Sequence, residues 1–312
     1  MEKTKILVYG AGAVGIFFGG QLFKAGFDVV FLDRTEKVER LGDNGFCFRS
    51  LSSKEFCFRP EVVDNVNNLP PQDLILVCVK AFQTYEIAMN LLPCIKPSTI
   101  VLSLQNGLEN EKIIADLIGK NMIMGCVPYF DGYLSSDWTV EQHAPAEIVF
   151  GELDYQPSDR EGWLSALFTH GGINHRIVRN ITENAWEKFI WNTTFNSISA
   201  LTQSSLNKIT ESAEILGTLR QMMMEVHQVA HKEGVELPPQ NIEELLTKNL
   251  GFGHMRSVTL QDIERGHIPE LESLMKGLLE RAKIHDVSTP VYRTVYNLIR
   301  LSLSNRNLGL IQ

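Results

Sequence analysis

The stretch that decides the fold lies near the start of the chain and is Lys5-Ile6-Leu7-Val8-Tyr9-Gly10-Ala11-Gly12-Ala13-Val14-Gly15. Residues 5–10 are a short apolar run, which is typical of a strand buried on both faces. Residues 10–15 match the pattern G-x-G-x-x-G, and residues 16–25 are an apolar stretch of helical length. A strand before this motif and a helix after it indicate a dinucleotide-binding unit.

The three glycines of this motif have separate physical roles. Gly10 permits a tight turn, Gly12 lets the backbone approach a pyrophosphate, and Gly15 allows the helix to pack closely on the strand. The pyrophosphate then lies at a helix N-terminus, where unpaired N–H groups and the helix dipole favour negative charge. We therefore expect the loop to bind the phosphates of a dinucleotide.

The residues that would contact the adenosine ribose give a mixed indication of the coenzyme. A strand predicted over residues 28–33 ends in Asp33-Arg34, and Asp33 lies 18 residues after Gly15. A carboxylate at this point binds the 2′-hydroxyl of NAD, whereas an arginine accommodates the 2′-phosphate of NADP. Arg34 favours NADPH, which we expect to be the coenzyme, while Asp33 leaves NADH open.

Strands and helices alternate through the first half of the chain. We expect strands over residues 74–79, 100–104 and 122–127, and helices over residues 84–91 and 109–118. This alternation predicts a parallel, doubly wound sheet with right-handed crossovers. Ligands bind beyond the carboxyl ends of such strands, so Lys80 and Asn106, which follow two of the strands, are expected near the coenzyme.

The character of the sequence changes after residue 130. An antiparallel pair is expected from residues 138–142 and 147–151, followed by a helix over 161–170 and a strand over 173–178. Beyond them the pattern is helical over residues 182–201, 213–232, 242–249, 271–285 and 290–303. The predicted fold is an α/β Rossmann-type doubly wound sheet in residues 1–179, followed by an all-α domain in residues 180–312.

Composition limits the class of protein. The chain has 312 residues, a formal net charge of −8 and 44% hydrophobic residues, which indicates a soluble globular protein. Its acidic balance argues against a nucleic-acid partner, and its apolar runs are too short to span a membrane. We expect a cytoplasmic protein. The apolar last helices can pack on the first domain or on a second subunit, so a homodimer remains open.

The cysteines and histidines predict neither a disulfide nor a metal site. The five cysteines are odd in number and contain no C-x-x-C pair, so we expect each to be a small buried hydrophobe in a reducing compartment. His227 and His231 lie four residues apart on a predicted helix, but no glutamate follows His227 as in the H-E-x-x-H motif. No metal ligands are therefore predicted.

One predicted helix of the second half carries a row of polar side chains. Lys188, Asn192 and Asn196 recur at intervals of four residues among aromatic and aliphatic neighbours, so they share one face of the helix. A cation in such a row could stabilise and protonate the oxygen of a carbonyl group that accepts hydride. Hydrogen bonds to neighbouring helices would explain the same spacing equally well.

With these segments in view, the chain resembles the ketopantoate reductases (2-dehydropantoate 2-reductases) over nearly its whole length. The glycine motif is shared with many dehydrogenases. More specific are the segment from Trp186 to Asn196 and, some 80 residues later, Leu260-Gln261-Asp262-Ile263 and Glu270. Arg34, Val79-Lys80 and Gln105-Asn106-Gly107 also match the family pattern.

The resemblance implies an NADPH-dependent reduction of ketopantoate to pantoate, within the synthesis of pantothenate and coenzyme A. It implies Lys188 as the general acid and Glu270 as the carboxylate that orients the substrate. It assigns a role in binding the keto-acid substrate to Asn106, Asn192, Asn196 and Ser257. It assigns coenzyme binding to Gly10, Ala11, Gly12, Ala13, Val14, Gly15, Arg34, Lys80 and Asn106.

The chain also departs from the family pattern. Where the family carries a substrate-binding serine, this sequence has Val258, with Ser257 before it and Thr259 after it. Valine cannot donate a hydrogen bond, so either neighbour replaces the serine or the substrate differs. A reductase of another small 2-keto or 3-keto acid is one alternative, and a non-catalytic dinucleotide-binding sensor is another.

Overall fold

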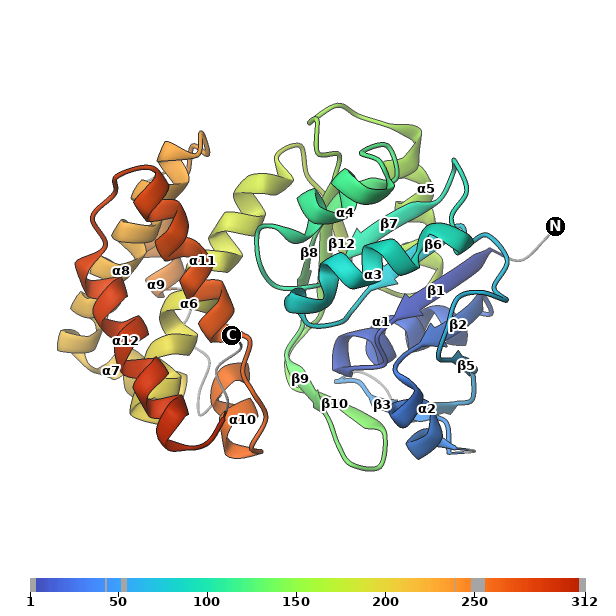
Figure 1. Ribbon diagram of the computed structural model, residues 1–312, viewed down its shortest axis with the longest axis horizontal. Coiled ribbons are helices and arrows are strands. Elements are labelled where there is room, and N and C mark those ends of the chain that lie inside the picture. The colour runs from blue at the N-terminus through green and yellow to red at the C-terminus, as the bar shows by residue number, and fades with distance from the viewer. Residues whose placement is uncertain (1–3, 43, 52–54, 239, 248–255, 309–312) are drawn as a thin grey trace. The chain divides into compact units, whose positions relative to one another are not determined.

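The computed structural model describes residues 4–42, 44–51, 55–238, 240–247 and 256–308 (Figure 1). The chain divides into two compact units, Met1–Thr182 and Glu183–Gln312.

An eight-stranded sheet forms the centre of the first unit, with the order β12-β11-β8-β7-β6-β1-β2-β5 (Figure 1). Its strands are β1 (Lys5–Tyr9), β2 (Asp28–Leu32), β5 (Glu61–Val63), β6 (Leu74–Val77), β7 (Ile100–Ser103), β8 (Ile123–Tyr129), β11 (Glu147–Gly151) and β12 (His175–Ile177). Neighbouring strands from β5 to β8 are parallel, and only β11 against β8 is antiparallel. The chain winds outward from β1 through β2 and then returns to β6, so the doubly wound sheet predicted from the sequence is confirmed.

Helices cover both faces of this sheet. They are α1 (Ala13–Lys24), α2 (Thr35–Leu41), α3 (Thr84–Asn90), α4 (Asn110–Ile118) and α5 (Asp159–His170), with the short turns η1 (Ala81–Gln83) and η2 (Leu92–Cys94). Ile6 and Val8 of β1 belong to one core with α1 and α5, and Leu7 belongs to a second core with α3 and α4. Successive side chains of a strand point to opposite faces, so a strand covered on both sides is apolar throughout.

A small second sheet packs on α1. Its strands lie in the order β4-β3-β10-β9 and are β3 (Phe46–Arg49), β4 (Phe56–Phe58), β9 (Gly132–Leu134) and β10 (Thr139–Gln142). A Cβ added at Gly19 would lie 2.7 Å from a ring atom of Phe31 in the large sheet. A Cβ added at Gly20 would lie 2.8 Å from a ring atom of Phe48 in the small sheet. Adjacent glycines therefore allow α1 to contact both sheets closely.

The predicted antiparallel pair of residues 138–142 and 147–151 is wrong. Both segments contain strands, but β10 is antiparallel to β9 and parallel to β3, whereas β11 is antiparallel to β8. The two strands belong to different sheets, because β10 pairs with the preceding β9 and with the distant β3, whereas β11 pairs with β8 and β12. The sequence pattern did not identify β3 and β9, which have only four and three residues.

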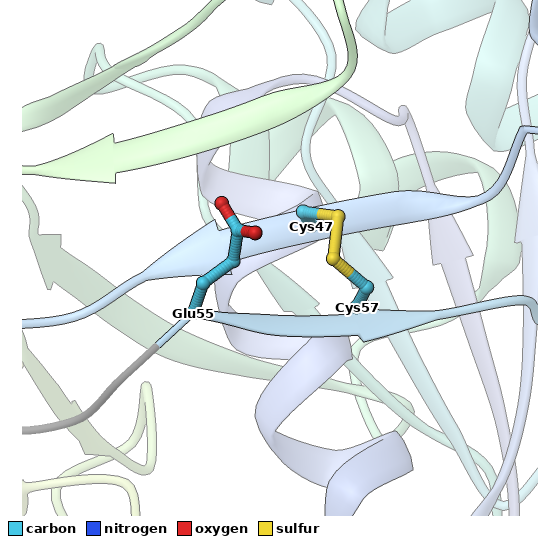
Figure 2. A group of neighbouring side chains, drawn as sticks. All are labelled: Cys47, Glu55 and Cys57. Atoms are coloured by element: carbon cyan, nitrogen blue, oxygen red, sulfur yellow. A yellow bond between two sulfur atoms is a disulfide. The ribbon is translucent and has the colours of Figure 1, made fainter.

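The prediction that no disulfide forms is also wrong. Cys47 and Cys57 lie directly opposite each other on β3 and β4, with their Cα atoms 4.1 Å apart, and their sulfurs are bonded (Figure 2). The phenylalanines next to the two cysteines in β3 and β4 point toward the core. Because neighbouring residues of a strand point to opposite faces, the two cysteines share the outer face of the hairpin. Cys94 and Cys126 are buried as expected, and burial raises the pKa of the Cys94 thiol to about 11.

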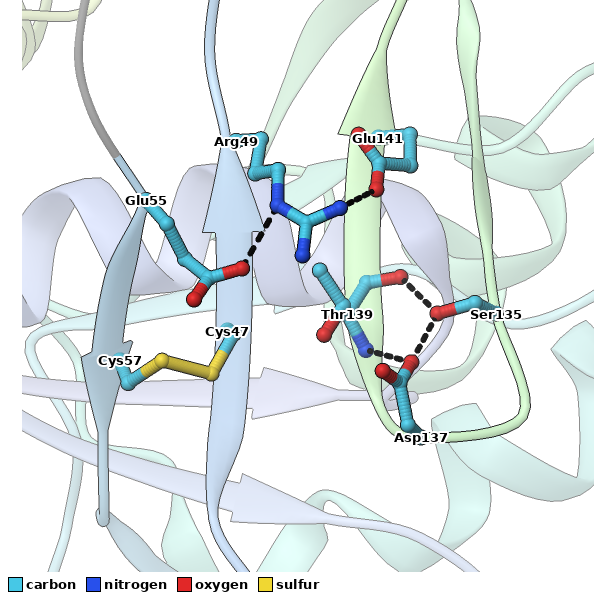
Figure 3. A network of polar contacts seen from close by, with 8 residues as sticks. All are labelled: Cys47, Arg49, Glu55, Cys57, Ser135, Asp137, Thr139 and Glu141. Carbon is cyan, nitrogen blue, oxygen red and sulfur yellow. Dashed lines mark hydrogen bonds and ion pairs between the residues drawn. A yellow bond between two sulfur atoms is a disulfide. The ribbon is translucent and has the colours of Figure 1, made fainter.

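Polar contacts on the outer face of the small sheet join its strands (Figure 3). Arg49 of β3 forms ion pairs with Glu55, 2.6 Å away, and with Glu141 of β10. In the turn between β9 and β10, Ser135 Oγ lies 2.7 Å from the Thr139 carbonyl oxygen, and the Thr139 N–H donates to Asp137 at 3.3 Å. These contacts close the turn.

The second unit is helical in the residues that the structure describes. Its helices are α6 (Ile181–Thr202, which begins in the first unit), α7 (Leu206–Glu211), α8 (Ala213–Lys232), α9 (Gln240–Thr247), α10 (Val258–Glu264), α11 (Leu271–Ile284) and α12 (Pro290–Asn305). Helix α8 contacts α7, α9, α11 and α12. Its buried Glu225 accepts hydrogen bonds from the N–H groups of Val291 (3.2 Å) and Tyr292 (2.9 Å), which fixes the start of α12.

Several helix predictions are confirmed with shifts of a residue or two. The helix expected over residues 213–232 has those bounds, and that expected over 290–303 extends to residue 305. Residues 248 and 249, the end of another predicted helix, lie outside the described residues. Among the described helices, none combines the length and the apolar character needed to cross a membrane.

The disulfide is expected to stabilise the first unit. Replacing Cys47 and Cys57 by serine removes a cross-link over a sequence separation of 10 residues, which should lower the free energy of unfolding by about 2–3 kcal/mol. Urea unfolding followed by circular dichroism measures this loss. An excess of reductant should produce the same loss in the unmodified chain and none in the double variant. An unmodified chain that unfolds at the same urea concentration with and without reductant contradicts this expectation.

Candidate functional site

The glycine loop connects β1 to α1 at the point where the strand order reverses. Gly10 has a φ of +110°, and a Cβ there would lie 2.8 Å from Val79 Cγ1, beyond the end of β6. A Cβ at Gly15 would lie 2.1 Å from the Gly10 carbonyl oxygen. At Gly12 the nearest atom is the Cys78 carbonyl oxygen at 4.0 Å, so space is open there. The geometry at Gly10 and Gly15 agrees with the turn and close packing expected of them, and the approach of a pyrophosphate to Gly12 stays a prediction.

The residues present fit a pyrophosphate. Gly12 precedes α1 as its N-cap, and no side chain caps that end of the helix. Ala13 and Val14 form the first turn, so their backbone N–H groups lie at the positive end of the helix dipole. Ala11 differs, because its N–H donates a 2.7 Å hydrogen bond to Asp33.

Asp33 is engaged by the protein at the end of β2. Its Oδ2 accepts hydrogen bonds from the Ala11 N–H and from Lys37 Nζ, both at 2.7 Å, and its Oδ1 accepts from the Arg34 N–H at 2.9 Å. The residue is 9% exposed, whereas Arg34 is exposed. The Asp33 carboxylate, because of which the sequence left NADH open as the coenzyme, therefore already accepts three hydrogen bonds from the protein.

Lys80 and Asn106 lie where the sequence predicted, after the carboxyl ends of β6 and β7. These strands are parallel neighbours, so both residues lie at the same edge of the sheet as the glycine loop. Lys80 is exposed and Asn106 is partly buried. The sheet thus brings the predicted coenzyme residues of the first unit to one edge.

A buried polar network that the sequence analysis missed holds Asn106. Asn110 Nδ2 donates to the Asn106 carbonyl oxygen at 2.9 Å. Thr84 Oγ1 lies 2.8 Å from Asn110 Oδ1 and accepts from Gln105 Nε2 at 2.9 Å. Ser103 Oγ donates to Gln105 Oε1 at 3.0 Å, and none of these four network side chains is more than 8% exposed. Three elements, β7, α3 and α4, therefore determine the position of Asn106.

The polar stripe lies on α6 in the second unit. Lys188 and Asn192 are partly buried, and Asn196 is 8% exposed. The Asn196 Oδ1 atom is buried and has no hydrogen-bond partner among the described residues. Buried amide oxygens are nearly always paired, so this atom is suited to a group that the described residues do not supply.

Two further predicted residues lie at the starts of helices in the second unit. Glu270 directly precedes α11 and is 8% exposed. Ser257 is the N-cap of α10, and its Oγ accepts a hydrogen bond from the Leu260 N–H at 3.1 Å. Thr259 is buried, while Val258 is 44% exposed. Capping therefore already engages one hydroxyl that was expected to replace the family serine.

One group of described residues has the composition of a metal site. The sulfurs of Cys47 and Cys57 and a Glu55 oxygen lie within 4.8 Å of one another (Figure 2). Because the sulfurs are bonded to each other, they carry no thiolate to hold an ion. His227 Nε2 lies 2.7 Å from the Leu237 carbonyl oxygen, and His231 lies 3.2 Å from Glu236, so these two rings contact different partners.

Comparison with known proteins matches both units to one family. Residues 6–155 match the family described as Ketopantoate reductase PanE/ApbA, and residues 180–302 match Ketopantoate reductase PanE/ApbA C terminal. An uncharacterized oxidoreductase of Bacillus subtilis is 27% identical, with 94% of this chain and 96% of the relative covered. A 2-dehydropantoate 2-reductase of Nostoc is 25% identical, with 98% and 97% covered.

The structural comparison agrees. The crystal structure of 2-dehydropantoate 2-reductase from Geobacter metallireducens has a TM-score of 0.88 and 26% identity, and it covers 96% of this chain and 99% of that one. The resemblance inferred from the sequence and the fold class are both confirmed. Since the two matched segments together extend over most of its length, the chain belongs to the ketopantoate reductase family.

Proposed function

We propose that this chain reduces the 2-keto group of ketopantoate to give pantoate, with NADPH as coenzyme. The observation that carries the proposal is the α6 stripe of Lys188, Asn192 and Asn196, which lies in the segment matched to the C-terminal part of the family. A protein that only senses a dinucleotide has no use for a proton donor. The stripe therefore favours an oxidoreductase over a sensor.

Reduction of a carbonyl group needs a hydride at carbon and a proton at oxygen. A bound nicotinamide dinucleotide supplies the hydride. As negative charge develops on the oxygen, the Lys188 ammonium stabilises it and donates the proton, and water then returns a proton to the lysine. The alcohol product thus carries one hydrogen from the coenzyme and one from Lys188.

The remaining polar residues would bind and orient the keto acid. The Asn192 and Asn196 amides provide donors for the substrate and acceptors for its hydroxyl or for Lys188. The carboxylate of Glu270 would accept a hydrogen bond from the substrate hydroxyl. Asn106, which the buried network positions in the first unit, would contact both substrate and coenzyme.

Three observations support NADPH as the coenzyme. Arg34 follows β2 directly and is exposed, which suits a guanidinium that binds a 2′-phosphate. Asp33, which would favour a 2′-hydroxyl, accepts three hydrogen bonds from the protein. Lys80, at the end of the neighbouring strand, adds a second cation at the same edge.

One observation favours a second candidate, a reductase of a different small keto acid. Val258 replaces the serine expected in the family, and its side chain is 44% exposed. Ser257 Oγ accepts the capping hydrogen bond of α10, so its O–H would be left to contact a substrate. The chemistry at Lys188 would be the same for either substrate.

Replacing Lys188 by alanine tests the proton donor. We expect turnover of ketopantoate to fall at least about 100-fold, because the variant lacks the acid, while coenzyme affinity remains unchanged. Steady-state assays with ketopantoate and a panel of other keto acids measure turnover, and fluorescence titration measures coenzyme binding. Lys208→Ala, at an exposed lysine of the same unit, is the matched control. Unchanged turnover in the Lys188 variant refutes the role of Lys188 as proton donor. If the unmodified chain does not turn over ketopantoate with either coenzyme, ketopantoate is not its substrate.

Replacing Arg34 by alanine tests the phosphate-binding residue. Loss of the guanidinium should lower kcat/KM with NADPH at least about tenfold and leave the value with NADH nearly unchanged, because only NADPH carries the 2′-phosphate. Arg40→Ala, at an exposed arginine of α2, should leave both values unchanged. An equal loss with both coenzymes would show that Arg34 does not bind the phosphate.

A further inference from the structure

Lys37 makes a contact that the sequence analysis did not anticipate. It lies on α2, four residues after Asp33, and its Nζ is 2.7 Å from Asp33 Oδ2. Both side chains are largely buried, with 25% of Lys37 and 10% of Asp33 exposed. An ion pair shielded from water is screened less by salt than a surface pair, so its charge balance affects neighbouring groups more strongly.

The position of Asp33 makes this charge balance important for the coenzyme. A carboxylate at the end of the second strand normally accepts a hydrogen bond from the 2′-hydroxyl of NAD. The same negative charge would repel the 2′-phosphate of NADP. Arg34, which is proposed to bind that phosphate, directly follows Asp33 in the chain. An uncompensated carboxylate would therefore also cancel part of the attraction between Arg34 and the phosphate.

The carboxylate is both neutralised and held in place. Lys37 supplies the opposite charge, while the backbone N–H groups of Ala11 and Arg34 occupy further acceptor sites on Asp33. Lys37 Nζ also lies 6.0 Å from the ring centroid of Trp138, in the turn between β9 and β10. An ammonium group near an aromatic ring is attracted to it, so Trp138 helps to keep Lys37 beside Asp33.

We propose that Lys37 determines coenzyme specificity, because it converts Asp33 from a ligand of the NAD ribose into an internal support of the glycine loop. The end of β2 then carries no uncompensated negative charge and accepts the 2′-phosphate at Arg34. This inference rests on the proposed function only in its use of NADPH. It concerns coenzyme binding and not the identity of the keto acid.

Coenzyme titrations of the full chain without keto acid test the inference. Lys37→Ala should weaken NADPH binding at least about tenfold, because the Asp33 charge is then uncompensated beside the phosphate. NADH binding should stay within about threefold or become tighter, because Asp33 is released to accept from the 2′-hydroxyl. Lys37→Arg should retain the preference of the unmodified chain, since it keeps the cation.

A second substitution separates charge from structural support. In the Lys37→Ala background, Asp33→Asn removes the negative charge but keeps an amide oxygen that can accept from the Ala11 N–H. NADPH affinity should recover to within about threefold of the unmodified chain. Lys112→Ala is the matched control, because Lys112 and Asp116 form an exposed ion pair with the same spacing on α4. Lys112→Ala should change the affinity for neither NADPH nor NADH.

Three results would overturn the inference. They are equal weakening of both coenzymes by Lys37→Ala, no change with either, and failure of Asp33→Asn to restore NADPH binding. A chain that turns over no ketopantoate but shows the predicted shift refutes the proposed substrate and leaves this inference standing. An unmodified chain that binds neither coenzyme refutes both.

Discussion

Helix α1 must contact three parts of the first unit at once, and the coenzyme site depends on how closely it does so. A Cβ would lie within 3 Å of the glycine loop at Gly15, of the large sheet at Gly19 and of the small sheet at Gly20. Glycine costs about 1 kcal/mol relative to alanine inside a helix, so three of them are unfavourable for the helix alone. Close packing on both sheets requires them, and it also fixes the start of α1 beside the open space at Gly12.

Electrostatics at the end of β2 completes this arrangement. Burying a carboxylate is costly unless donors and an opposite charge compensate it, and Asp33 receives both. The hydrogen bond from the Ala11 N–H to Asp33 couples the glycine loop to the end of β2, so these two segments are positioned together. The residue that first suggested NAD thus contributes to the shape of the loop.

Two buried polar residues of the second unit differ in whether the protein supplies their hydrogen-bond partners. The Glu225 carboxylate is fully buried on α8 and accepts from two N–H groups at the start of α12, so its burial is explained by the fold. Asn196 is also buried, yet its Oδ1 has no partner among the described residues. The partners of Glu225 therefore account for its burial, whereas the described residues supply no partner for the Asn196 Oδ1 atom.

The sequence by itself determined the elements whose signals are local. The glycine motif, the apolar runs of β1, β6 and β7, and the spacing of Lys188, Asn192 and Asn196 each lie within a short segment, so periodicity was sufficient to predict them. Only the tertiary structure decided the pairing of β10 with β3, the disulfide between Cys47 and Cys57, and the contact of Lys37 with Asp33. Strand partners and side-chain directions depend on which surfaces the folded chain brings together, and no local pattern contains that information.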